Sequence, residues 1–240
     1  MIDFITCKLV RNAASKGTLK SMNPATIKRA LDYEERQGSL DDESIINRAA
    51  QQRCLSQIPE SAISLNRLRK VGWNGENGFH VAAHWECLNM LPQKFLTIEN
   101  LLLKNKEGDT AFHVAARFGC TNQIPAACLN KQTITVRNNF DATPLHEAAT
   151  WGKLDQIPKF LLDLENLLLR DKSKEAVYCR AARLGYASHI PADAFRGKRA
   201  FIKVEIDDAK DWVSSMAFGA SLEAKKRITK SIDDWFSRIE

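Results

Sequence analysis

Two short hydrophobic markers recur along the chain at a constant interval. One is an apolar residue followed by proline, and the other is a pair of alanines. Each returns 33 residues after its previous occurrence, and the two keep one register over five copies. The prolines are Pro59, Pro92, Pro125, Pro158 and Pro191, and the alanine pairs begin at Ala49, Ala82, Ala115, Ala148 and Ala181. A fixed period of this length predicts a chain built from stacked structural repeats.

The alanine pair belongs to a predicted first helix. Phe112, Ala115 and Ala116 are spaced so that they share one helical face. Because the paired alanines are small, they let neighbouring helices approach closely. Gly119 follows at the position where a helix commonly ends on a glycine. We therefore expect one short, tightly packed helix at the start of each copy.

The second half of a copy predicts another short helix and a turn. Pro125 suits the first turn of a helix because its missing N–H group costs nothing there. A helix running through that position would be broken, so we expect the second helix to begin near each proline and to be short. Ile134 and Val136 then alternate with polar residues, and residues 138–142 are expected to form a hairpin-like turn leading to the next helix.

Two copies carry a recognisable motif. Residues 109–116 read Asp-Thr-Ala-Phe-His-Val-Ala-Ala and residues 142–149 read Ala-Thr-Pro-Leu-His-Glu-Ala-Ala, followed by Gly119 and Gly152. This resembles the Thr-Pro-Leu-His-x-Ala-Ala-x-x-Gly motif of ankyrin repeats and has their period. The resemblance implies an all-α ankyrin-repeat solenoid of about five repeats, with degenerate N- and C-terminal capping repeats. The recurring proline departs from the family pattern, whose second helix runs through that place.

The resemblance sets three predicted segments: a basic N-terminal cap at 1–43, the repeat array at 44–203 and a helical cap at 204–240. Residues 9–17 and 212–219 echo the first helix in weaker form. A terminal repeat needs a polar outer surface, so atypical ends are expected as caps. The last segment carries an apolar helical stripe of Leu222, Ile228, Ile232, Trp235, Phe236 and Ile239.

Composition and charge narrow the function classes. The chain of 240 residues is 44% apolar with a formal net charge of +6, which is ordinary for a folded protein. Neither a secretion signal nor a membrane-spanning run is visible, so a cytoplasmic location is expected, with secretion as an effector left open. Residues 1–30 hold six Lys/Arg and one Asp. That segment is either a solvated cap face or a basic arm for nucleic acid or an anionic surface.

The histidines and cysteines occupy repeat positions rather than a chemical site. His80, His113 and His146 are equivalent, and stacked repeats set such positions on the order of 10 Å apart, too far to share a metal. The resemblance implies that this histidine ties adjacent hairpin backbones by hydrogen bonds. Cys54, Cys87 and Cys120 are separated in the same way, which disfavours disulfides. With no catalytic motif recognisable, we expect a protein with no enzymatic activity, cofactor or metal.

The resemblance also implies a binding surface, because ankyrin proteins bind through hairpin tips and the exposed side of first helices. The candidate partner-binding residues are Trp73, Asn74, Trp85, Lys106, Arg117, Phe118, Asn139, Phe140, Trp151, Lys172 and Arg183. Aromatic residues beside arginine are typical of binding hot spots. For Trp85, Phe118 and Trp151, packing between repeats is an equal alternative.

The function expected from these features is a protein–protein interaction scaffold or adaptor that binds a protein partner as a monomer. The fold alone does not name the partner. One alternative is a nucleic-acid or anionic-surface binder that uses residues 1–30. Another is a bacterial or phage effector or inhibitor.

Overall fold

The computed structural model describes residues 2–37, 44–72, 74–215 and 221–239. These residues form helices and turns, and one isolated antiparallel bridge joins Arg170 to Ala176. None of the helices in the described ranges is both long and apolar enough to cross a membrane. The all-α fold class predicted from the sequence is confirmed for these residues.

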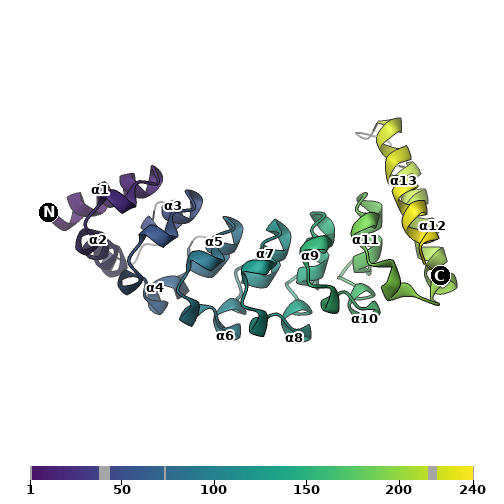
Figure 1. Cartoon of the computed structure of the whole chain (residues 1–240), viewed down its shortest axis with the longest axis horizontal. Helices are drawn as coiled ribbons and strands as arrows, with labels where there is room; N and C mark the ends of the chain where they lie inside the picture. The colour runs from purple at the N-terminus through teal and green to yellow at the C-terminus, as the bar shows by residue number, and fades with distance from the viewer. Residues whose placement is uncertain (1, 38–43, 73, 216–220, 240) are drawn as a thin grey trace. The chain divides into compact units, whose positions relative to one another are not determined.

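The chain divides into two compact units, Met1–Leu129 and Asn130–Glu240. The α-helices of the first unit are α1 (Ile2–Ser15), α2 (Pro24–Gln37), α3 (Ile45–Gln51), α4 (Leu65–Arg69), α5 (Gly78–His84), α6 (Ile98–Leu101) and α7 (Ala111–Phe118). Those of the second unit are α8 (Lys131–Ile134), α9 (Pro144–Thr150), α10 (Leu164–Leu167), α11 (Val177–Arg183), α12 (Arg199–Ser215) and α13 (Leu222–Ser237). Figure 1 labels them.

The same order of elements recurs along the chain: a short α-helix, two single 3-10 turns and a shorter α-helix. The 3-10 turns are Leu55–Gln57, Glu60–Ala62, Leu88–Met90, Gln93–Phe95, Thr121–Gln123, Ala126–Cys128, Leu154–Gln156, Lys159–Leu161, Ala187–His189 and Ala192–Phe195, with an earlier one at Leu19–Ser21. The period seen in the sequence therefore corresponds to a recurring local structure.

The paired alanines are buried in the first helices, which pack against one another. In the first unit α3 packs against α5 and α5 against α7, and in the second unit α9 packs against α11 (Figure 1). All ten alanines are fully buried: Ala49, Ala50, Ala82, Ala83, Ala115, Ala116, Ala148, Ala149, Ala181 and Ala182. A larger side chain at these positions would push neighbouring helices apart.

The region around each proline differs from the prediction. Pro125 lies between two 3-10 turns, with φ −53° and ψ 133°, and Pro59 has φ −57° and ψ 134°. These angles are extended, so the proline precedes a single helical turn instead of starting an α-helix. Its ring excludes the residue before it from helical backbone angles. The second helix is thus reduced to one 3-10 turn on each side of the proline.

The segment after the second turn contains a further short helix. Ile134, which alternates with Val136 in the sequence, closes α8 and is fully buried. The cause is a polar cap: the side chain of Asn130 accepts a hydrogen bond from the backbone N–H of Thr133 at 3.1 Å. Such caps favour helical turns. Equivalent caps at α6 and α10 are Thr97 and Asp163.

Each first helix ends in a left-handed residue. Gly119 has φ +77° and Gly152 has φ +63°, as the predicted helix end requires. Arg53 and Glu86 take this backbone conformation in the earlier copies, with φ 51° and 53°. Gly152 has a second constraint, because a Cβ atom there would lie 2.4 Å from the Tyr186 ring.

The repeated histidine has the structural role that the sequence predicted. The Nε2 atom of His80 lies 2.9 Å from the carbonyl oxygen of Asp109, and that of His146 lies 3.3 Å from the carbonyl oxygen of Glu175. Both carbonyls belong to the next hairpin along the chain. The Nδ1 atom of His146 contacts the Thr143 hydroxyl at 2.9 Å, which fixes the ring. Burial lowers the pKa of both histidines, to about 4 for His146.

The three equivalent cysteines form a thiol ladder in the first unit. Each thiol is buried and points at the carbonyl oxygen of an alanine in the preceding first helix. The pairs are Cys54 with Ala14 at 3.8 Å, Cys87 with Ala50 at 3.9 Å and Cys120 with Ala83 at 3.3 Å. All the cysteines are free thiols. Burial raises the pKa of Cys87 and Cys120 to about 12, so both remain protonated at neutral pH.

The N-terminal segment folds as a pair of longer helices, α1 and α2, which pack together, and α1 also packs against α3. A buried carboxylate, Glu34, connects them. It accepts a hydrogen bond from Arg11 at 2.5 Å and lies 3.1 Å from the backbone N–H of Ile45, where α3 begins. The predicted echo of a first helix at residues 9–17 is therefore the second half of a longer helix.

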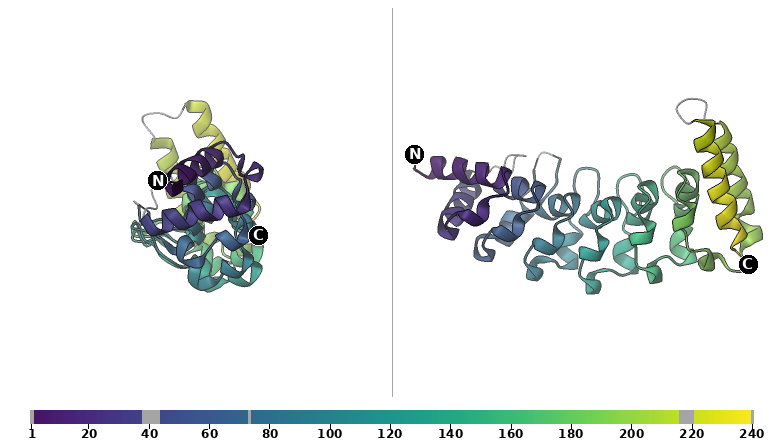
Figure 2. Two further views of the ribbon diagram at one scale, coloured as in Figure 1. Left: turned by 90° about the vertical axis from the view of Figure 1, so that its left-hand side faces the viewer. Right: turned by 45° about the horizontal axis from the view of Figure 1, so that its top comes forward.

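The C-terminal segment is also a helix pair, α12 and α13, which lie side by side (Figure 2). Helix α12 begins at Arg199, so the predicted boundary at residue 204 falls inside it. Trp235 is fully buried and its Nε1–H donates to the carbonyl oxygen of Ile190 at 3.1 Å. Leu222 is 70% exposed, which corrects its place in the predicted apolar stripe. Residues 216–219 of the predicted echo at 212–219 lie outside the described residues.

Candidate partner-binding surface

The candidate residues divide between the two units, and Trp73 lies outside the described residues. In the first unit, Asn74 and Lys106 are exposed at neighbouring hairpins, where the backbone N–H of Lys106 donates to the carbonyl oxygen of Asn74 at 3.2 Å. Asn74 and Trp85 also line a cavity of about 240 Å³ in this unit. The hairpins are thus joined to each other through the backbone, so their positions are fixed by the fold.

His84 makes an aromatic contact with Phe118 on the neighbouring first helix, and Trp85 lies beside His84 at the end of its own helix. The ring of His84 lies 4.9 Å from the Trp85 ring and 4.5 Å from the Phe118 ring, between centroids. Both residues are half-buried. Arg117, next to Phe118, forms an ion pair at 2.6 Å with the buried carboxylate of Asp109. These contacts give the three residues a role in packing, whatever their role in binding.

In the second unit the candidates at the hairpin tips are more open. Phe140 is 57% exposed, and its carbonyl oxygen accepts a hydrogen bond from the backbone N–H of Lys172 at 3.0 Å. The side chain of Asn138 accepts hydrogen bonds from the N–H groups of Phe140 and Ala142 and so shapes the turn. Asn139 and Lys172 are exposed beside it. The structure therefore presents an aromatic ring on a rigid turn.

Trp151 is 55% exposed at the end of the first helix α9. Arg183, at the end of α11, is bound to its own hairpin by a double contact with Glu175, at 2.7 and 3.1 Å. Its guanidinium also lies 4.2 Å from the centroid of the Trp212 ring. Arg183 and Arg117 hold equivalent positions, and each neutralises an acidic residue of its hairpin.

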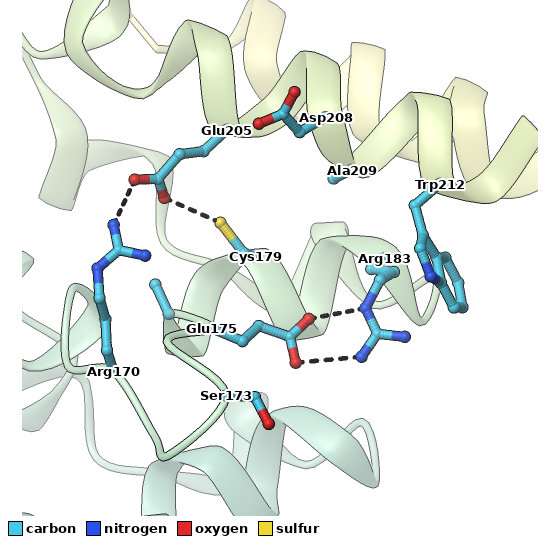
Figure 3. Close-up of a pocket in the computed structure, with 10 residues that line it drawn as sticks. Arg170, Ser173, Glu175, Cys179, Arg183, Glu205, Asp208, Ala209 and Trp212 are labelled. Atoms are coloured by element: carbon cyan, nitrogen blue, oxygen red, sulfur yellow. Dashed lines mark hydrogen bonds and ion pairs between the residues drawn. The ribbon is translucent and has the colours of Figure 1, made fainter.

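Arg183 lines a groove that the sequence did not predict (Figure 3). The groove has a volume of about 540 Å³ and lies between α12, α11 and the hairpin before α11. Figure 3 shows Glu205, Asp208 and Trp212 along α12, opposite Arg170 and Arg183. These α12 residues belong to the segment interpreted only as a cap. Their helical spacing was visible in the sequence, but which face would remain open was not.

Two of the carboxylates in this groove, Glu205 and Glu175, are ionised and held by arginine side chains. Glu205 forms an ion pair with Arg170 and accepts hydrogen bonds from the Tyr178 hydroxyl at 2.5 Å and the Cys179 thiol at 3.2 Å. Burial opposes ionisation, but these hydrogen bonds outweigh it and lower the pKa of Glu205. The pKa of Glu175 is lowered in the same way by its arginine partners against the effect of burial.

The groove holds its charged side chains in fixed ion pairs beside an aromatic ring. Burial raises the pKa of the Cys179 thiol, so it stays protonated and is a poor nucleophile. Among the side chains that the structure describes, no three His, Cys, Asp or Glu residues are placed to hold a metal ion. Fixed ion pairs with an aromatic ring at one end favour contacts with another molecule's side chains.

No family model matches the chain, and no curated protein matches its sequence. The exposed candidate residues and the groove are therefore the features of the molecule that bear on its function.

Proposed function

We propose that this chain is a non-catalytic ankyrin-type repeat protein that binds a protein partner through its hairpin tips and the exposed ends of its first helices. The observation that carries the proposal is the exposure of Phe140 and Trp151, at 57% and 55%. Aromatic side chains held open on rigid elements are typical of binding hot spots. Burying them under a partner would remove a large apolar area from water.

Two structural features support the ankyrin-type interpretation of the repeats. The Thr-Pro-Leu-His segment at residues 143–146 starts α9 with Thr143 as the N-cap and His146 reaching back to it. His80 and His146 each contact a backbone carbonyl oxygen of the hairpin that follows their helix. A device that links each copy to the next is what a solenoid requires, and we infer that fold for the repeats.

The experiment is affinity capture from a lysate of the source organism, with quantitative mass spectrometry of the captured proteins. The test variant carries Phe140→Ala and Trp151→Ala together. The matched control is Phe160→Ala, because Phe160 is 69% exposed but lies in a 3-10 turn after Pro158, outside the proposed surface. All proteins are first checked for the same melting temperature.

A specific partner should be enriched by the unmodified protein and by the Phe160 variant, and lost from the double variant. The partner's affinity for the double variant should fall at least tenfold, about 1.4 kcal/mol. Failure to enrich any protein, or equal enrichment by all three proteins, contradicts the proposed surface. Loss of the partner only with Phe160→Ala would place binding on the other side of the repeats.

A further inference from the structure

Helix α12 carries an exposed stripe that combines apolar and acidic side chains. Phe201, Glu205, Asp208 and Trp212 recur at helical spacing and so share one face. Phe201 is 63% exposed, Trp212 is 40% exposed, and Val204 beside them is 66% exposed. The buried side of α12, which includes Ile206, packs against α11 and α13, and at the edge of the stripe Glu205 and Trp212 also contact α11. Exposed apolar side chains grouped on one helix indicate an interaction surface.

The charges of the groove beside this stripe leave one carboxylate uncompensated. Arg170 is paired with Glu205, and Arg183 is paired with Glu175. Asp208, the third carboxylate lining the groove, has no ion-pair partner among the described residues. Asp207 and Asp211 are exposed next to it. The surface is therefore locally acidic in a chain whose formal net charge is +6. A surface complementary to it would carry a basic side chain flanked by large apolar side chains.

Helix α1 presents that combination. Phe4, Ile5 and Leu9 are 59%, 53% and 58% exposed. Lys8 lies among them on the exposed face and has no ion-pair partner among the described residues. The buried side of the same helix, with Val10, packs on α2 and α3. The face of α1 thus matches the face of α12 in apolar character and opposes it in charge.

We propose that this protein associates with a second copy of itself head to tail, with the α1 face of one copy on the α12 face of the other. Lys8 would pair with Asp208, and Phe4 and Leu9 would cover Phe201 and Val204. Two different surfaces that complement each other make a heterologous contact, which adds copies until a ring closes or a filament grows. This replaces the monomer expected from the sequence.

The test is the molar mass of the full chain in solution, measured by light scattering after size exclusion and by sedimentation velocity. The mass should rise beyond that of one copy between about 1 and about 100 µM protein. It should fall when NaCl is raised from about 50 to about 500 mM, because salt screens the charges. Lys8→Glu and Asp208→Lys should each weaken association at least tenfold.

Charge reversal gives the decisive comparison. The double variant with Lys8→Glu and Asp208→Lys restores opposite charges across the contact and should associate again. An equimolar mixture of the two single variants should also associate, because one supplies an intact α1 and the other an intact α12. Asp193→Lys is the control. Asp193 is exposed in the same unit but outside α12, so this variant should behave like the unmodified protein.

Three outcomes overturn the proposal. The first is a single-copy mass at every concentration in low salt. The second is self-association that neither single variant weakens. The third is an α1 face that binds vesicles of phosphatidylcholine with phosphatidylserine, but not phosphatidylcholine alone, while the protein stays single in solution. The capture experiment on Phe140 and Trp151 is independent of all three.

Discussion

The Nε2 atom of His80 lies 2.9 Å from the carbonyl oxygen of Asp109, in the hairpin that follows the helix of His80. Both residues are buried, and the same carbonyl also accepts a hydrogen bond from the backbone N–H of Asn105 at 2.9 Å, so the histidine supplies its second partner. A buried hydrogen bond of this kind contributes about 0.5–1.5 kcal/mol net. The contact therefore contributes to the coupling between neighbouring repeats as well as to the local fold.

Replacing this histidine should destabilise the first unit. We expect His80→Ala to lower the free energy of unfolding by roughly 1–3 kcal/mol, from the lost hydrogen bonds. The control is His189→Ala, which removes a histidine whose contact with Asp155 is long, at 3.6 Å, and partly exposed. That change should cost no more than about 0.5 kcal/mol. Urea unfolding measures both, and equal costs would contradict the linking role.

Stability should fall in mildly acidic solution because of His146. Burial first, and the nearby Arg180 guanidinium second, lower the pKa of His146 to about 4 from the ordinary 6.5. Below pH 6.5 the unfolded chain binds a proton that the folded chain refuses. The stability contributed by the neutral His146 side chain is therefore fully present above pH 6.5 and is lost as the pH falls towards about 4. The loss is on the order of 3 kcal/mol.

The measurement is urea unfolding at a series of pH values from about 7.5 to about 4. The variant His146→Gln removes the titrating group and should show a smaller loss across the same window. An identical loss in the variant would assign the pH dependence to other groups.

Two glycines with the same backbone twist should respond differently to alanine. Gly152 has φ +63° and Gly197 has φ +67°, so both substitutions introduce similar backbone strain. A Cβ atom at Gly152 would meet the Tyr186 ring at 2.4 Å, whereas nothing lies within 4 Å at Gly197. Gly152→Ala should therefore cost roughly 1–3 kcal/mol more than Gly197→Ala. Thermal unfolding followed by circular dichroism decides, and equal melting temperatures would contradict the close packing.

Truncation of two tryptophans in the second unit, one buried and one exposed, should change the stability of the protein by very different amounts. Trp235 is fully buried and hydrogen-bonded to the Ile190 carbonyl, so Trp235→Ala should destabilise by about 3–5 kcal/mol. Trp151 is 55% exposed, so Trp151→Ala should change stability by no more than about 0.5–1 kcal/mol. Chemical unfolding of both variants is the measurement. A large cost at Trp151 would show that it packs against neighbouring residues.

The sequence predicted the parts of the fold that repeat. The alanine pairs, the left-handed Gly119 and the histidine contacts all follow from a local pattern seen several times. The turns around Pro125 and the short helix ending at Ile134 were less accessible. There, a proline and an Asn130 cap compete with the helix and strand periods that apolar spacing alone suggests.

The groove was beyond sequence reasoning for a different reason. Glu205, Asp208 and Trp212 are far from Arg170 and Arg183 in the chain, and they meet because α12 packs on α11. Helical spacing groups the α12 residues on one face but does not say which face stays open. The surface exposure of Phe201 depends on the same packing. The direction in which α12 lies on its neighbours decides which of its faces stays open and whether Phe201 is exposed.

The thiol ladder of Cys54, Cys87 and Cys120 has a kinetic consequence. Each thiol is covered by the helix to which it donates, so a reagent reaches it only when those two helices separate. The rate of alkylation at each cysteine therefore reports how often one helix pair opens, as amide exchange does for a backbone group. Mass spectrometry of a single labelled time course would order the openings along the first unit and show from which end it begins to come apart.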